Sequence, residues 1–195
     1  MKSLLFPIVL FSTLLTGCSN MKPEDFAERE PRLKIEEYFA GKTKAWGIFE
    51  DRFGTLRRQF VVDIDGSWDG DSLTLVEDFV YDNDDTERRI WQIEKTGEHT
   101  YAGTADGVIG TARGESYGNA LHWRYTFALK IGDGTWNVDF DDWMFLQGDG
   151  ILINRARVSK FGIELGQVTI AFSKNIVARV NQDIEPAERP SFASR

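Results

Sequence analysis

Short runs of alternating apolar and polar residues fill most of the chain between residues 43 and 172. Turn signals rich in Gly, Asp and Asn separate these runs at intervals of roughly 8–12 residues, which is typical of β-strands joined by hairpins. The expected strands are Lys44–Arg52, Leu56–Ile64, Leu73–Tyr81, Arg88–Lys95, Tyr101–Ala105, Val108–Glu115, Leu121–Ile131, two within Thr135–Ser159, and Gln167–Phe172. Because no intervening helix is long enough to connect parallel strands, the pattern predicts an antiparallel sheet.

The run Leu121–Leu129 shows the two faces of this sheet most clearly. One face carries Leu121, Trp123, Tyr125, Phe127 and Leu129, and the other carries His122, Arg124, Thr126 and Ala128. A sheet with one apolar and one mostly polar face covers a dry interior. About ten such meandering strands close most simply into an antiparallel up-and-down, lipocalin-like β-barrel, and a sandwich is the alternative.

The segment Thr135–Ser159 places charged residues inside an apolar hairpin. Asp141 and Asp142 lie in its first strand, and Arg155 and Arg157 lie in its second. Neighbouring strand residues point to opposite faces, so the two acids cannot form one close acid/base dyad. We interpret the set as ion pairs between the strands, in which an arginine compensates the buried acid. Residues Glu77, Asp78, Arg88 and Arg89 predict a similar set on another hairpin.

The six Trp, fourteen Phe and five Tyr residues either fill the barrel or line a ligand cavity within it. We expect a small apolar or amphipathic, lipid-like ligand. The candidate ligand-binding residues are Trp123, Tyr125, Asp141, Asp142, Trp143 and Arg155. Two alternatives stay open: an enzyme that uses Asp141, Asp142 and Arg155 at the barrel mouth, and a protein-interaction module of an envelope complex.

The first eighteen residues predict an export signal. Lys2 precedes the apolar stretch Leu4–Leu15, which is too short to span a bilayer, and the sequence Leu15-Thr16-Gly17-Cys18 follows. It resembles the bacterial lipobox, which implies removal of residues 1–17 and attachment of lipid, including acyl chains such as palmitate, to Cys18. Because Ser19 and not Asp follows the cysteine, we expect anchoring in the outer membrane, facing the periplasm. An ordinary secretory peptide is the alternative.

Residues 18–42 are expected to be the lipidated cysteine and a tether, with a short helical stretch at Ile35–Ala40. The barrel domain is expected to span residues 43–174, and residues 175–195 are expected to be a disordered tail.

Composition excludes several classes of function. A net charge of −8 is unsuited to nucleic-acid binding, and a single cysteine permits no intrachain disulfide. His99 and His122 are too few for a familiar zinc site, so we expect no metal and no cofactor. The G-x-S-x-G match at Gly114–Gly118 lacks the helix of a nucleophile elbow, and Asp63–Asp71 lacks the last glutamate of a calcium loop. Both are interpreted as hairpin turns.

Short motifs rich in aromatic residues, glycine and charge recur along the chain: Ala45-Trp46-Gly47, Asp51-Arg52-Phe53-Gly54, Gly66-Ser67-Trp68, Glu77-Asp78-Phe79-Val80-Tyr81, Arg89-Ile90-Trp91, Tyr101-Ala102-Gly103, Gly118-Asn119-Ala120-Leu121-His122-Trp123, Asp141-Asp142-Trp143-Met144-Phe145 and Asn154-Arg155-Ala156. With these motifs the chain resembles a Gram-negative lipoprotein family known as domain of unknown function 3833. The resemblance spans about Leu33–Phe172 and implies no activity or catalytic residue.

Overall fold

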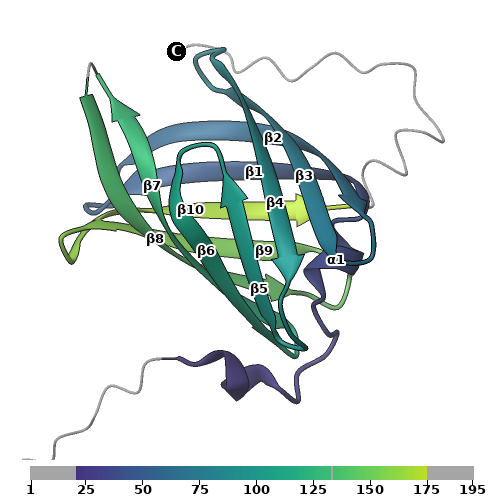
Figure 1. Cartoon of the computed structure of the whole chain (residues 1–195). Helices are drawn as coiled ribbons and strands as arrows, with labels where there is room; N and C mark the ends of the chain where they lie inside the picture. The colour runs from purple at the N-terminus through teal and green to yellow at the C-terminus, as the bar shows by residue number, and fades with distance from the viewer. Residues whose placement is uncertain (1–20, 133, 175–195) are drawn as a thin grey trace, which may run out of the picture.

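The computed structural model describes residues 21–132 and 134–174, which form a closed antiparallel β-barrel (Figure 1). Its ten strands are β1 (Gly41–Asp51), β2 (Leu56–Trp68), β3 (Ser72–Tyr81), β4 (Thr86–Lys95), β5 (Thr100–Ala105), β6 (Val108–Tyr117), β7 (Ala120–Ile131), β8 (Gly134–Leu146), β9 (Leu152–Lys160) and β10 (Ile163–Ser173). Each strand pairs with its sequence neighbours, and β1 pairs with β10 to close the barrel. The predicted barrel is confirmed, and the alternative of a sandwich is excluded. The expected signal peptide, Cys18 and the tail lie outside the described residues.

The alternation of side chains along each strand separates the interior from the exterior. Leu121, Trp123, Tyr125, Phe127 and Leu129 of β7 all face the interior, as the sequence pattern predicts. On β9, buried and exposed residues alternate from Leu152 to Val158. The hydrophobic core lies inside the barrel and takes residues from nearly every strand.

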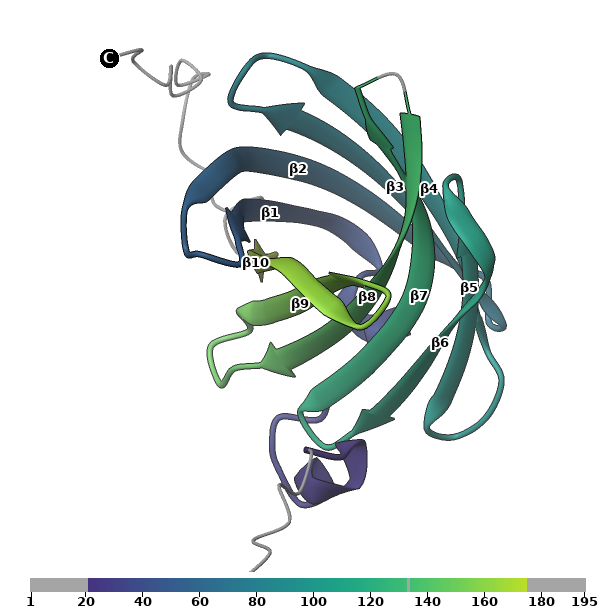
Figure 2. The same ribbon diagram turned by 90° about the vertical axis from the view of Figure 1, so that its left-hand side faces the viewer.

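The hairpin turns alternate between the two ends of the barrel. The turns β1–β2, β3–β4, β5–β6, β7–β8 and β9–β10 lie at one end, which we call the mouth. Figure 2 looks toward this side of the molecule. The remaining turns lie at the other end, which we call the closed end, because the short helix α1 (Ile35–Tyr38) packs there.

Helix α1 is held in the closed end by apolar packing and by a buried acid. Ile35 and Phe39 are 2% and 5% exposed and reach the core. Glu36 accepts hydrogen bonds from Lys95 Nζ at 2.5 Å and from Tyr101 Oη at 2.8 Å, which ties the helix to β4 and β5. The backbone of Phe39 approaches Gly66 so closely that a Cβ on residue 66 would overlap the carbonyl oxygen of Phe39.

The segment before α1 also packs against the barrel. The 3₁₀ helix η1 (Pro23–Phe26) places Phe26 against Trp143 and Phe145 on the outside of β8, with ring centroids 6.0 and 5.4 Å apart. Gly118 has a φ of +51° and leaves room for the carbonyl of Phe26. Much of the segment that we expect to be a tether is therefore attached to the closed end.

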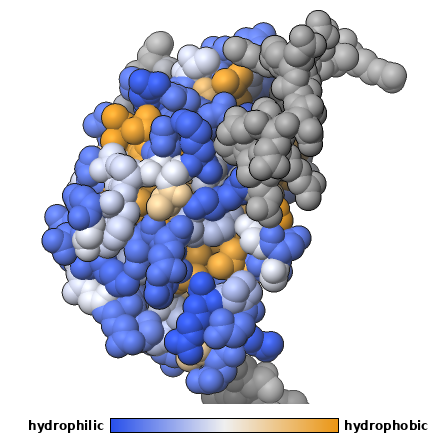
Figure 3. Space-filling view, turned by 90° about the vertical axis from the view of Figure 1, so that its right-hand side faces the viewer, coloured by the Kyte–Doolittle hydropathy of each residue, from blue (hydrophilic) through white to orange (hydrophobic). Residues whose placement is uncertain are grey.

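The side of the molecule that carries α1 presents a largely hydrophilic surface, with small and separated apolar areas (Figure 3). Among the described residues, no helix is both long and apolar enough to cross a membrane.

Candidate functional site: the barrel cavity

The barrel interior is a cavity of about 720 Å³ that extends from α1 to the hairpins of the mouth. At the closed end it is bounded by Ile35 and Phe39, and at the mouth by Ile131, Trp136 and Leu165. A volume of this size falls within the roughly 300–1,000 Å³ of typical small-molecule sites. The aromatic residues therefore line a space that could accommodate a ligand.

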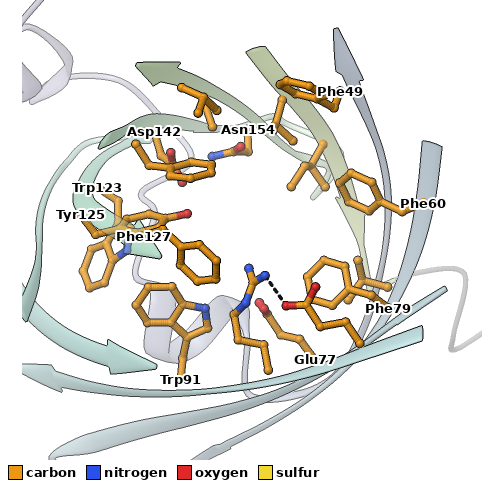
Figure 4. A pocket seen from close by; sticks show the side chains of 18 of the residues that line it. Phe49, Phe60, Glu77, Phe79, Trp91, Trp123, Tyr125, Phe127, Asp142 and Asn154 are labelled. Atoms are coloured by element: carbon orange, nitrogen blue, oxygen red, sulfur yellow. Dashed lines mark hydrogen bonds and ion pairs between the residues drawn. The ribbon is translucent and has the colours of Figure 1, made fainter. Parts of the chain in front are cut away.

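Aromatic rings cover much of the wall (Figure 4). Trp91 lies edge-on to Trp123 and to Tyr125, with ring centroids 5.8 and 5.4 Å apart. Glycines 103 and 114, on the intervening strands β5 and β6, leave the space that the indole ring of Trp123 occupies. Such contacts give the wall a defined shape, because rings that pack against one another from β4 and β7 cannot shift independently.

One polar cluster in the wall is centred on Arg89 of β4. Arg89 Nη2 donates a hydrogen bond to Glu87 Oε1 at 2.6 Å, and its guanidinium lies 5.0 Å from the ring centroid of Phe79 and 4.8 Å from that of Phe127. Tyr81 Oη donates to the other oxygen of Glu87 at 2.8 Å. These contacts hold the pKa of Glu87 below its usual range although burial opposes them.

Glu77 of β3 belongs to the same cluster. Burial raises its pKa to about 7, Arg89 acts to lower it, and Glu87 adds to the rise. Glu77 lies directly opposite Arg89 of β4 in the strand register, as the sequence predicts for these two residues. Near neutral pH this carboxyl group is therefore divided between its neutral and charged forms.

A second polar group lies across the cavity on β8 and β9, opposite Glu77 (Figure 4). Asp142 is 6% exposed, and burial together with the charge of Asp141 raises its pKa to about 8, against the opposing effects of Asn154 and Arg89. Asn154 is 1% exposed. Within the described part of the chain, Asp142 Oδ1 and both polar atoms of the Asn154 amide are buried with no partner in good hydrogen-bond geometry, although Asn154 is close enough to Asp142 to act against the rise in its pKa.

Unpaired buried polar atoms of this kind cost roughly 1–3 kcal/mol each, so folding alone does not account for them. Tyr125 lies nearby, and burial and the proximity of Asp142 raise the pKa of its phenol well above its usual value. At neutral pH the second group therefore consists of neutral side chains that can donate to and accept from a polar atom in the cavity.

Three of the six residues expected to bind a ligand line the cavity: Trp123, Tyr125 and Asp142. Asp141, Trp143 and Arg155 lie on the outer face, because each is an odd number of positions from an inward residue of its strand. Trp143 stacks on His122 at 4.2 Å, and Asp141 Oδ2 lies 3.2 Å from His122 Nε2. The expected six therefore do not form one site.

The ion pair expected between Asp142 and an arginine of the β8–β9 hairpin does not form. Asp141 and Asp142 do point to opposite faces, but Arg155 and Arg157 are exposed and cannot compensate the buried Asp142. Among the charged groups that influence Asp142, the cation is Arg89, which comes from the opposite wall. His122, on the mostly polar outer face of β7, is nevertheless largely buried, with its side chain 13% exposed.

The other motifs have structural roles. Ser116 of the G-x-S-x-G match is buried, and its hydroxyl donates to the carbonyl of Leu33 at 2.7 Å. In the calcium-like segment, Asp63 and Asp65 pair with Lys44 and Lys42 on the outer face. Within the described ranges, no cluster of His, Cys, Asp and Glu is arranged to hold a metal ion.

Sequence reasoning missed Glu87, Trp91 and Asn154 as cavity residues. Glu87, Arg89, Trp91 and Ile93 alternate along β4, so a period of two could have assigned all four to one face. The same period along β9 places Asn154 on one face with Leu152, Ala156 and Val158, so it could have been found in the same way.

The model of a family described as protein of unknown function, DUF3833, matches residues 12–174 of the chain. A search of curated proteins found no match to the chain.

Proposed function

The chain belongs to the DUF3833 family, and we propose that it binds a small apolar or amphipathic molecule inside its barrel. The observation that carries this proposal is the cavity of about 720 Å³, with its aromatic wall and its two buried polar groups. A barrel that served only as a scaffold would gain stability by filling such a space with side chains, since cavities of this kind are costly.

The polar groups indicate the kind of ligand. Arg89 is already engaged by Glu87 and lies beside Glu77, so an anionic headgroup would have to compete for it. On the opposite wall, Asp142 is mostly protonated at pH 7 and can donate a hydrogen bond. These features favour a lipid-like molecule with a hydrocarbon part and an uncharged oxygen, such as a hydroxyl or ester group.

The lipobox-like sequence at Leu15–Cys18 supports a location for this activity. We propose that Cys18 carries a lipid anchor in the outer membrane and that the barrel faces the periplasm. Mass spectrometry of the N-terminal peptide from the mature protein would test the anchor. An unmodified Cys18 within an intact or otherwise processed N-terminus would contradict it.

Ligand binding can be tested on residues 21–195, which contain every described element and the whole core. Native mass spectrometry after purification should show a bound species that organic extraction releases as lipid. Nile red, a neutral apolar dye, should bind and should be displaced by monoolein more effectively than by oleate.

A matched pair of variants separates binding in the cavity from binding elsewhere. Ala156 lines the cavity and is 3% exposed, whereas Ala171 is exposed on the outer face of β10. Ala156→Phe should reduce Nile red binding about tenfold or more by occupying the cavity, and Ala171→Phe should leave it unchanged. Equal binding by the two variants, with no lipid released from the wild type, would refute the proposal.

The enzyme alternative does not gain support from the geometry. Its three residues, Asp141, Asp142 and Arg155, are divided between the outer and inner faces of the barrel and do not converge on one point.

A further inference from the structure

The most exposed large apolar side chains of the described residues gather at the mouth. Phe161 is 90% exposed, Phe53 is 78% exposed and Ile163 is 59% exposed. Together with Leu56, Ile131 and Trp136, which are also exposed, they form what we call the apolar rim. Exposed apolar groups are common singly, but a cluster of six around an opening indicates an interaction site.

The members of the apolar rim come from three hairpins that are adjacent in the barrel. The strand order β2-β1-β10-β9-β8-β7 makes the turns β1–β2, β9–β10 and β7–β8 successive around the mouth. In Figure 2 the β7–β8 turn lies at the top, apart from the other two. Two contacts join them: Arg52 N donates to the Leu165 carbonyl at 2.9 Å, and Lys160 Nζ lies 4.3 Å from the ring centroid of Trp136. These contacts link the three parts of the apolar rim.

Basic side chains accompany the aromatic ones. The Arg52 guanidinium lies 4.8 Å from the ring centroid of Phe53, and Lys160 Nζ lies 5.3 Å from that of Phe161. Arg58 and Lys130 add positive charge, while Asp51 is paired with Arg57. Glu50 and Glu164 also lie here, so the charge of the surface is close to balanced in a chain whose net charge is −8.

Acidic residues are concentrated in another part of the mouth. The β3–β4 turn contains Asp82, Asp84 and Asp85, and Asp106 lies in the β5–β6 turn. The mouth thus has an acidic part and a part with aromatic and basic tips, and only the second is suited to a lipid headgroup region.

We propose that the apolar rim docks on the surface of a lipid bilayer and places the mouth of the cavity against it. Aromatic rings at hairpin tips can enter the boundary between headgroups and acyl chains, and adjacent Arg and Lys side chains contact the phosphates. Ile131 and Trp136 of the apolar rim also line the cavity, so its wall is continuous with the docked surface. An apolar molecule could then pass between bilayer and cavity without crossing water.

The position of η1 gives the docked barrel a direction. Its Phe26 carbonyl lies against Gly118 in the β6–β7 turn, so the described chain begins at the closed end, away from the apolar rim. The lipid surface that the apolar rim contacts therefore lies on the side of the barrel opposite η1.

Vesicle flotation of residues 21–195 tests the proposal, with vesicles of phosphatidylethanolamine and phosphatidylglycerol as the probe. The wild-type barrel should float with the vesicles, and brominated acyl chains should quench part of its tryptophan fluorescence, a part that Trp136→Phe should remove. The double variant Phe53→Ser with Phe161→Ser should partition at least tenfold less, since each ring withdraws a large apolar area from water.

The matched control is Val80→Ser with Ile90→Ser, which removes two exposed apolar side chains, 40% and 41% exposed, from the outer wall. This control should bind vesicles as the wild type does. Equal partition of the two double variants, or no flotation of the wild type, would overturn the proposal. The proposal would also be overturned if the wild type did not bind vesicles but formed a concentration-dependent dimer in sedimentation, and if Phe53→Ser with Phe161→Ser abolished that dimer. The occupant of the apolar rim would then be a second copy of the chain.

The docking proposal and the ligand proposal can fail separately. Ala156→Phe should lose Nile red binding while it still floats with vesicles, and the variant of the apolar rim should bind Nile red normally in solution.

Discussion

The Asp142→Asn variant should be about 1 kcal/mol less stable than the wild type near pH 4 and more stable than it at pH 8. Burial raises the pKa of Asp142 from 3.8 to about 8, so between these values the folded barrel retains a proton that the unfolded chain has released. The free energy of unfolding of the wild type therefore falls as pH rises through this window. Asparagine has a similar shape and does not titrate, so the variant lacks this contribution.

The structure sets the size of the effect. At pH 7 the pH is roughly three units above the pKa of Asp142 in the unfolded chain. At about 1.36 kcal/mol per unit, keeping Asp142 protonated in the folded barrel lowers the free energy of unfolding by at most about 4 kcal/mol. Relaxation and water in the cavity reduce this, and exchanging the acid for an amide costs about 1 kcal/mol. We expect a net gain for the variant of about 1–3 kcal/mol at pH 7, rising toward pH 8.

Urea unfolding of residues 21–195, followed by tryptophan fluorescence at several values between pH 5 and 8, measures this difference. Asp141→Asn is the control, because it changes the neighbouring acid on the outer face and should retain most of the wild-type pH dependence. If the unfolding free energies of the wild type and Asp142→Asn remain parallel from pH 5 to 8, then Asp142 is ionised in the folded barrel and the reasoning is refuted.

Two further substitutions test the closed end and the polar cluster by the same unfolding measurement. Gly66→Ala should destabilise the barrel by about 1–3 kcal/mol, because the new Cβ would overlap the Phe39 carbonyl, whereas Gly148→Ala, with no atom within 4 Å, should change stability by less than about 0.5 kcal/mol. A larger loss for Gly148→Ala would contradict this packing. Arg89→Met should cost about 2–3 kcal/mol at pH 7, since it leaves the partly buried Glu87 unpaired, and the loss should shrink below about pH 5 as the carboxyl groups protonate. A loss that does not vary with pH would show that Arg89 acts mainly through packing.

The β8–β9 hairpin shows where sequence reasoning succeeds and where it stops. Alternation predicts that Asp141 and Asp142 point to opposite faces, and the structure confirms this. The expected partners Arg155 and Arg157 were wrong for Asp142, because the register of the hairpin places both arginines on the outer face with Asp141 and sets Asp142 opposite Ala156. Arg89 influences Asp142 from a strand more than forty residues away in the sequence, so only closure of the barrel brings the two together.

The sequence by itself determined the strands, their antiparallel order and the inward set Leu121 to Leu129, because these follow from a period of two and from local turn residues. It also predicted the lipobox at Cys18, since that signal lies within a few adjacent residues. Only the tertiary structure decided that the barrel stays hollow, that α1 closes one end, and that the exposed aromatic residues gather at the other. Those features depend on the volumes and distances that arise when ten strands close on one another, and no local pattern of residues contains them.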